Sequence, residues 1–253
     1  MVSGRSGAGA LLVVSLLLAT TGASAAGQAP LALHVEAYGG RSWTAASDLT
    51  LRVGQERLEI RRVRWEDESF ESPIYYGLRL RVERADQPWS AVLDFTHAKV
   101  VADPTQEVDL EGSFGGAAVD GRRPLADVLE HLEMSHGYNV LTVGARRRWT
   151  PGGGDGRLGL HAAAGLGVLV PHVEVRVAGE RTFRHQLTGP LARLGVGASV
   201  PLTDRMEAFA DYGWMVVRSR LELEGGNALH LTTHTHALNA GIAVRALGPP
   251  RDR

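Results

Sequence analysis

The spacing of the connections between amphipathic segments constrains this chain more than any other feature of its sequence. Eight segments alternate between apolar and polar or small residues with the two-residue period of a β-strand. They fall at residues 31–42, 74–84, 88–100, 137–150, 156–170, 186–200, 205–221 and 230–246. The connections alternate in length, and Pro151–Gly156 and Leu202–Asp204 are short whereas Val101–His136 is long. Outer-membrane barrels have this plan, with tight periplasmic turns and long extracellular loops.

We therefore predict an all-β fold, an eight-stranded antiparallel up-and-down transmembrane β-barrel in the bacterial outer membrane. The apolar face of each strand must point to lipid, because hydrocarbon does not solvate charge. Trp89 and Trp149 then face outward beside short turns, where a periplasmic aromatic girdle belongs. A soluble lipocalin-like barrel is the alternative; it would invert the two faces and leave these tryptophan positions unexplained.

The opposite face of the strands carries nine charged residues. They are Glu36, Arg79, Arg81, Glu83, Asp94, Arg146, Arg193, Glu207 and Asp211. An eight-stranded barrel is only wide enough inside for side chains. We therefore expect four cations and five anions to pair with one another and to close the barrel rather than line a wide pore.

The ends of the chain complete the predicted domain organisation. Residues 1–25 read as a secretory signal, with Arg5, an apolar core at Ala8–Ala19 and a small-residue cleavage site at Ala23–Ala25. An N-terminal membrane anchor is the alternative, although the apolar run is too short to span a bilayer as a helix. Residues 26–247 form the barrel and 248–253 a polar tail. A net charge of -1 gives no reason to expect nucleic acid, and the chain has no cysteine for a disulfide.

Two long connections have patterns of their own. The segment Thr44–Pro73 is too polar to cross lipid, and Leu49–Val53 and Leu58–Val63 predict a hairpin in the first extracellular loop. The second loop contains the glycine-rich stretch Gly112–Arg123, which predicts another turn or flap.

Polar residues near the outer rim share the phase of the lipid-facing side. In segment 88–100, His97 comes after the apolar residues of the lipid-facing side, and in segment 137–150 Asn139 comes before them. His172 and Glu174 continue the lipid-facing side of segment 156–170. Gln186 is in phase with that side of segment 186–200. His97, His172 and Glu174 are a possible two-histidine, one-carboxylate set, which suits a first-row divalent ion such as Fe(II). His136 is a possible further member, and Lys99 shares the face of His97. The alternative is that these are ordinary polar residues at a membrane boundary.

Several segments, in this order, resemble those of the outer-membrane lipid A oxidase family known from rhizobia. They are Pro73–Arg79, Leu93–Val100, Ser135–Asn139, Pro171–Val175, Gln186–Pro190 and Leu202–Arg205. The resemblance runs from about Leu33 to Val244, and the Asp-Phe-Thr-His-Ala-Lys and Pro-His-Val-Glu segments carry most of its specificity.

The resemblance implies an oxygen-dependent enzyme that oxidises the proximal glucosamine of lipid A to 2-aminogluconate and releases hydrogen peroxide. It implies a divalent metal, Fe or Mn, held by His97, His172 and Glu174, with no organic cofactor. The roles that follow are catalytic for Asn139, Gln186 and His136, and binding of an anionic lipid A group for Lys99. The partner would be outer-leaflet lipid A or lipopolysaccharide, and the protein a monomer. The competing hypothesis is a non-enzymatic surface barrel that stiffens the membrane or binds a partner through its extracellular loops.

Overall fold

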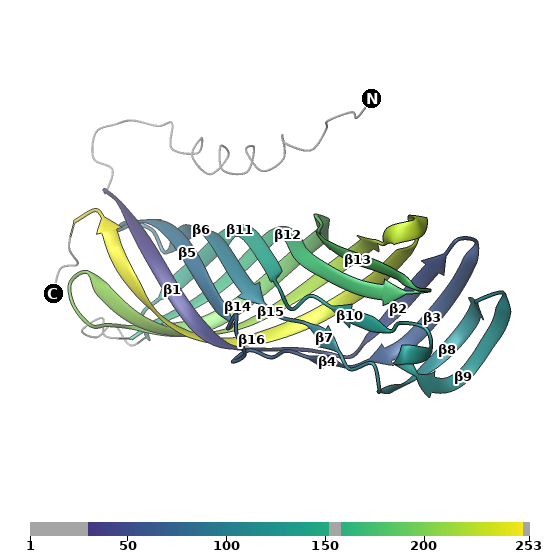
Figure 1. Ribbon diagram of the computed structural model, residues 1–253. Coiled ribbons are helices and arrows are strands. Elements are labelled where there is room, and N and C mark those ends of the chain that lie inside the picture. Colours follow the sequence, from purple (N-terminus) through teal and green to yellow (C-terminus); the bar gives the residue numbers. More distant parts are fainter. Residues whose placement is uncertain (1–29, 152–157, 250–253) are drawn as a thin grey trace, which may run out of the picture.

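The computed structural model describes residues 30–151 and 158–249. Eight long strands form a closed antiparallel barrel (Figure 1). They are β1 (Leu31–Thr44), β5 (Tyr76–Arg84), β6 (Trp89–Ala98), β11 (Tyr138–Trp149), β12 (Gly159–Val177), β14 (Thr188–Pro201), β15 (Met206–Glu222) and β16 (Ala228–Leu247). Each pairs with the next in this order, and β16 pairs with β1 to close the ring.

The barrel confirms the predicted fold class and all eight predicted strands. The largest difference is at β12, which continues to Val177 instead of ending near residue 170. Its added residues pair with two further strands, β10 (His131–Glu133) and β13 (Glu180–His185), so the strand remains hydrogen-bonded beyond the barrel. The predicted signal segment and most of the short connection Pro151–Gly156 lie outside the described residues.

The long connections fold into further β-structure at the end of the barrel opposite the start of β1 and the end of β16 (Figure 1). Besides β10 and β13, its strands are β2 (Ser47–Val53), β3 (Glu56–Val63), β4 (Trp65–Glu66), β7 (Val101–Ala102), β8 (Glu107–Phe114) and β9 (Ala117–Pro124). Two short 3-10 turns, η1 (Leu125–Asp127) and η3 (Glu224–Gly226), complete it. We call this part the extracellular cap. No helix in the described residues has the length and apolarity that crossing a bilayer requires.

The cap contains both predicted loop structures. The first-loop hairpin is β2–β3, which turns at Gly54 with a φ of 58°, a left-handed conformation that favours glycine. The glycine-rich stretch forms β8–β9 and turns at Gly115 and Gly116. β2 pairs with the first residues of β16, so the sheet β2–β3–β8–β9 projects from the barrel wall.

The cap has an apolar core like that of a water-soluble protein. Leu49, Leu58 and Ile60 of its hairpin are at most 1% exposed, and they belong to one cluster with Val173 and Val217, which lie on the barrel strands. The interior of the molecule therefore changes character along the strands, from polar within the membrane to apolar above it.

Candidate functional site

The barrel interior is filled by a network of ion pairs. Arg79 on β5 contacts carboxylates of three other strands: its Nη1 donates to Glu36 and to Asp211, both at 2.9 Å, and its Nε donates to Asp94 at 2.5 Å. All four side chains are at most 8% exposed. Arg193 on β14 adds a second cation to Asp94 at 2.8 Å. The network ties together strands that are not neighbours in the barrel wall.

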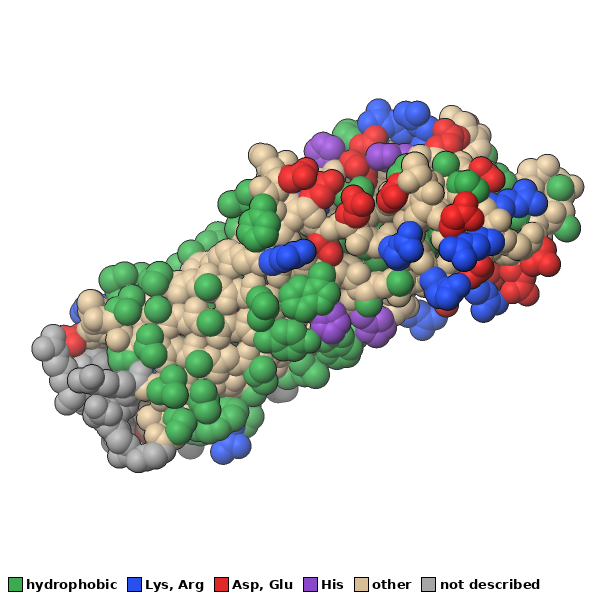
Figure 2. Space-filling model, turned by 90° about the horizontal axis from the view of Figure 1, so that it is seen from below, with side chains coloured by type: hydrophobic (Ala, Val, Ile, Leu, Met, Phe, Trp, Pro, Cys, Tyr) green, Lys and Arg blue, Asp and Glu red, His purple; other side chains and the backbone are tan. Residues whose placement is uncertain are grey.

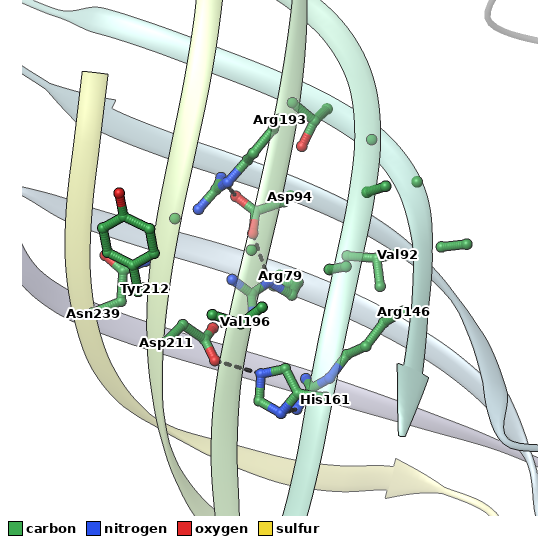
Figure 3. Close-up of a pocket in the computed structure, with 18 residues that line it drawn as sticks. Arg79, Val92, Asp94, Arg146, His161, Arg193, Val196, Asp211, Tyr212 and Asn239 are labelled. Atoms are coloured by element: carbon green, nitrogen blue, oxygen red, sulfur yellow. Dashed lines mark hydrogen bonds and ion pairs between the residues drawn. The ribbon is translucent and has the colours of Figure 1, made fainter. Parts of the chain in front are cut away.

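The same network continues toward the periplasmic turns. Arg81 pairs with Glu36, Glu83 and Glu207, so that both arginines share Glu36. Arg146 donates to Nδ1 of His161, and Nε2 of that ring donates to Asp211 at 2.6 Å (Figure 3). These contacts confirm the predicted interior pairing.

A small cavity remains among these side chains (Figure 3). Its volume is about 50 Å³, and it is lined by Arg79, Asp94, Arg146 and His161 among others. This volume holds a few water molecules. In the described residues the interior is therefore a packed polar plug, and the search for a site moves to the outer wall.

The outer wall divides into an apolar belt and a polar rim. On the face shown in Figure 2, hydrophobic side chains are spread over the barrel and charged side chains gather over the cap. On β15 the two faces exchange polarity: Asp211 faces inside and Tyr212 outside within the belt, whereas Leu221 faces inside and Arg220 outside above it. At the change of polarity the outward Trp43 stacks on His236 with ring centroids 5.6 Å apart. Trp214 on β15 lies opposite His236 in the strand pairing, and we take Trp43, Trp214 and His236 as markers of the outer membrane boundary.

Two residues that the sequence predicted for the site meet on this outer wall. His97 and Asn139 lie opposite each other on β6 and β11, and Nδ1 of His97 is 2.9 Å from the amide oxygen of Asn139. The imidazole also stacks on Tyr76 of β5 at 5.1 Å. Nε2 of His97 is buried and has no hydrogen-bond partner among the described residues. The pair is thus fixed in orientation, with one buried ring nitrogen that has no hydrogen-bond partner in the described part of the chain.

His172 and His136 form the second group on the wall. His172 is 9% exposed, and its ring contacts His136 at 5.2 Å, His185 at 4.6 Å and Phe183 at 4.4 Å. Nδ1 of His172 is buried without a partner in the described residues. This part of β12 lies above the apolar belt, and burial together with the charges of His185 and His136 lowers the pKa of His172. A neutral imidazole is the form that binds metal ions.

Glu174 lies one step further along β12, within a compact set of possible metal ligands. One ligand atom each from Glu174, His131 and Glu133 lies within 4.8 Å of the others. Glu133 is also 3.8 Å from Nδ1 of His136, which links this set to the histidines described above. Arg181 donates two hydrogen bonds to Glu174 and balances part of the acidic charge. We call His131, Glu133, His136, His172 and Glu174 the rim cluster.

The predicted ligands His97, His172 and Glu174 do not converge on one point. Asn139 lies between: it is opposite His97 on one side and opposite Val170 of β12 on the other. Two strand spacings, roughly 10 Å, therefore separate His97 from β12.

Gln186 and Lys99 have partners elsewhere. The amide of Gln186 donates to the carbonyl of Glu222 and accepts from its N–H, both at 2.8 Å. It therefore fastens the start of β14 to the end of β15. Lys99 is 5% exposed and donates to Glu68 and to the carbonyl of Ser72 in the first loop.

Sequence reasoning left out Glu133 and gave His131 no role. The two are separated by one residue, so a strand places both on one face. Only the pairing of β10 with β12, which sets Glu133 opposite Glu174, brings them to the other ligands.

Comparison with known proteins adds the following. No family model matches the chain, and no curated protein does. One solved structure that resembles it is Neisserial surface protein A, with 10% sequence identity over 85% of this chain and 96% of that chain and a TM-score of 0.39. Another is Ail of Yersinia pestis, with 12% identity over 84% of this chain and 97% of that chain and a TM-score of 0.34. A third is the outer membrane protease OmpT of Escherichia coli, with 7% identity over 85% of this chain and 96% of that chain and a TM-score of 0.42.

The fold itself defines the class of protein. A closed eight-stranded antiparallel barrel, with a continuous apolar belt outside and charged residues inside, is a transmembrane β-barrel of the bacterial outer membrane.

Proposed function

We propose that this barrel is a metal-dependent enzyme that oxidises the glucosamine of lipid A in the outer leaflet. One observation carries the proposal: His97, Asn139 and the rim cluster lie on the lipid-facing wall directly above the apolar belt. This is the level at which the sugar headgroup of an outer-leaflet lipid sits. The resemblance to lipid A oxidases at the same segments supports the choice of substrate.

The donors of the rim cluster fit the divalent metal that this chemistry requires. Carboxylates and imidazoles together suit Fe(II) or Mn(II). His172 has a buried nitrogen without a partner in the described residues, and Glu174, His131 and Glu133 lie within bonding reach of one small volume. We propose that Glu174 and His172 hold the metal together with His131 and Glu133. His97 then belongs to the substrate side of the site rather than to the ligand set.

The reaction is the two-electron oxidation of a sugar hemiacetal. The anomeric carbon loses its C–H bond and its hydroxyl proton, dioxygen takes up two electrons and two protons to become hydrogen peroxide, and water opens the resulting lactone to 2-aminogluconate. A divalent metal held by the rim cluster would supply the redox chemistry that the reaction of a sugar with dioxygen requires. Nε2 of His97 would take the hydroxyl proton, and the hydrogen bond that Nδ1–H of His97 donates to the amide oxygen of Asn139 would hold the ring in place.

Mass spectrometry of lipid A from a Gram-negative host provides the test. The host should express the protein together with a phosphatase that frees the anomeric position, because the hemiacetal is the group oxidised. We expect a species heavier by one oxygen atom with the native protein and with His236→Ala, a control histidine on the far side of the barrel. His172→Ala and His97→Ala should abolish it. An unchanged lipid A spectrum with inserted native protein would contradict the proposal.

The second candidate is a surface barrel that binds a partner through the cap. The projecting sheet favours it, because β9 pairs only with β8 and leaves its other edge open among the described strands. An open edge can accept an extended strand from another chain. Under this hypothesis, substitutions in β9 abolish function and His172→Ala leaves it unchanged.

A further inference from the structure

A groove on the outer wall has the composition of a binding site for an anionic lipid. It lies across β12, β14, β15 and β16 and has a volume of about 610 Å³. Val168, Leu187 and Pro190 form one part of its lining, and Arg218, Arg220 and His230 form another. Leu187 is 67% exposed, which leaves a large apolar side chain uncovered beside two guanidinium groups.

The basic part of the groove has an excess of positive charge. Arg218 and Arg220 alternate on the outward face of β15, and His230 of β16 lies opposite Arg220. The charged neighbours that lower the pKa of His230, after burial, are all arginines: Arg220, Arg52, Arg218 and Arg57. No ion pair joins Arg218 or Arg220 to a carboxylate in the described part of the chain.

Glu222 is the one carboxylate of the groove lining. Its backbone is held by Gln186. One carboxylate balances one of the two arginines, so a net positive charge remains to be balanced by a ligand.

The groove is at the height of lipid headgroups. On the outward face of β15 the order is Tyr212, Trp214, Val216, Arg218 and Arg220, so Arg218 is four residues beyond the boundary residue Trp214. Four residues of a strand rise about 13 Å, which is roughly 9 Å of height at a tilt near 45°. The polar headgroup layer extends about 5–8 Å above the hydrocarbon on each side, so the backbone of Arg218 lies just above it and the long side chain can reach down into it. Val168 and Pro190 lie opposite each other at about the level of Arg218, and Val168 is two residues from Leu166, which is 68% exposed in the belt, so an occupant can extend from the arginines toward the acyl chains.

We propose that this groove binds the headgroup of a phosphorylated outer-leaflet lipid, with the phosphate on Arg218 and Arg220 and an acyl chain against Val168 and Pro190. Guanidinium groups bind phosphate oxygens with two parallel hydrogen bonds, which gives both strength and orientation. The binding depends on neither the rim cluster nor the oxidase proposal, because the groove shares no residue with either.

Native mass spectrometry of the whole barrel in detergent, titrated with diphosphoryl lipid A, tests the proposal. We expect saturable binding that falls roughly tenfold or more in the variant Arg218→Gln/Arg220→Gln, since each guanidinium loses its charged hydrogen bonds. The control Arg122→Gln/Arg123→Gln removes the same charge from the distant strand β9 and should bind as the native protein does. Enzymatically dephosphorylated lipid A should bind the native protein weakly. Its affinity should be similar to that of diphosphoryl lipid A for the variant Arg218→Gln/Arg220→Gln.

A second variant separates the lipid from a soluble anion and guards against misfolding. Val168→Ser removes an apolar side chain and leaves both arginines in place, so it should weaken binding of the lipid but not that of a soluble anion, while the barrel still shows folded mobility on unheated gels. Equal affinity of the native protein and the arginine variant for lipid would overturn the proposal. Displacement of the lipid by millimolar inorganic phosphate would also overturn it, because the site would then bind a free anion.

Discussion

Arg79 is the side chain whose removal should damage the barrel most. It joins β5 to carboxylates on β1, β6 and β15, and its guanidinium lies 5.1 Å from the centre of the Tyr38 ring. Arg79→Met keeps a side chain of similar length but removes the charge. The variant leaves Glu36, Asp94 and Asp211 buried with one cation fewer.

The expected cost follows from the burial of these partners. Glu36 is 0% exposed and Asp94 3%, so solvent cannot replace the lost guanidinium. Breaking a buried ion pair by removing one partner costs about 3–5 kcal/mol. In the variant Arg81 still contacts Glu36, and Arg193 still contacts Asp94. We therefore expect a loss of unfolding free energy near the lower bound, about 3 kcal/mol. This corresponds to a change of roughly 150-fold in the equilibrium between folded and unfolded barrel.

Urea titration in lipid vesicles, followed by tryptophan fluorescence, measures this loss. Arg147→Met is the matched control, because Arg147 faces outward over the rings of Trp89 and Trp149 and should cost about 1 kcal/mol or less. The double variant Arg79→Met/Asp94→Asn should recover part of the loss, since it removes one uncompensated anion. A loss from Arg79→Met no larger than that of Arg147→Met would refute the assignment of the interior network as the stabilising plug.

Two further substitutions test other parts of the structure. In Gly77→Ala the new Cβ would lie 2.0 Å from the ring of Tyr38 on the neighbouring strand β1. We therefore expect about 1–3 kcal/mol of destabilisation in the same urea titration. An unchanged unfolding free energy would mean that the ring moves aside at no cost. Ile60→Ala removes a fully buried side chain from the cap and should cost about 2–5 kcal/mol there. We expect faster protease cleavage within the cap while the membrane-spanning part of the barrel strands stays protected. Cleavage of both at equal rates would contradict this expectation.

The sequence alone determined the barrel. Alternation with a period of two, connections of alternating length and tryptophans beside short turns each follow from the requirement that a strand in lipid be apolar outside and paired through its whole backbone. The same phase identified the interior charges, because residues that share a face share an environment. These are local properties of each strand, which a single sequence displays directly.

Only the tertiary structure decided how the rim and the cap are arranged. Glu133 meets Glu174 because β10 pairs with β12, and Gln186 holds Glu222 because β14, which begins two residues after Gln186, pairs with β15. Above the membrane the rule for the faces is reversed, so apolar residues such as Leu229 point inward and arginines outward. The period of two continues unchanged through this reversal, and the solvent around the strand assigns each face its role. A sequence pattern records which residues share a face, and the pairing of distant segments and the surrounding medium determine what that face contacts.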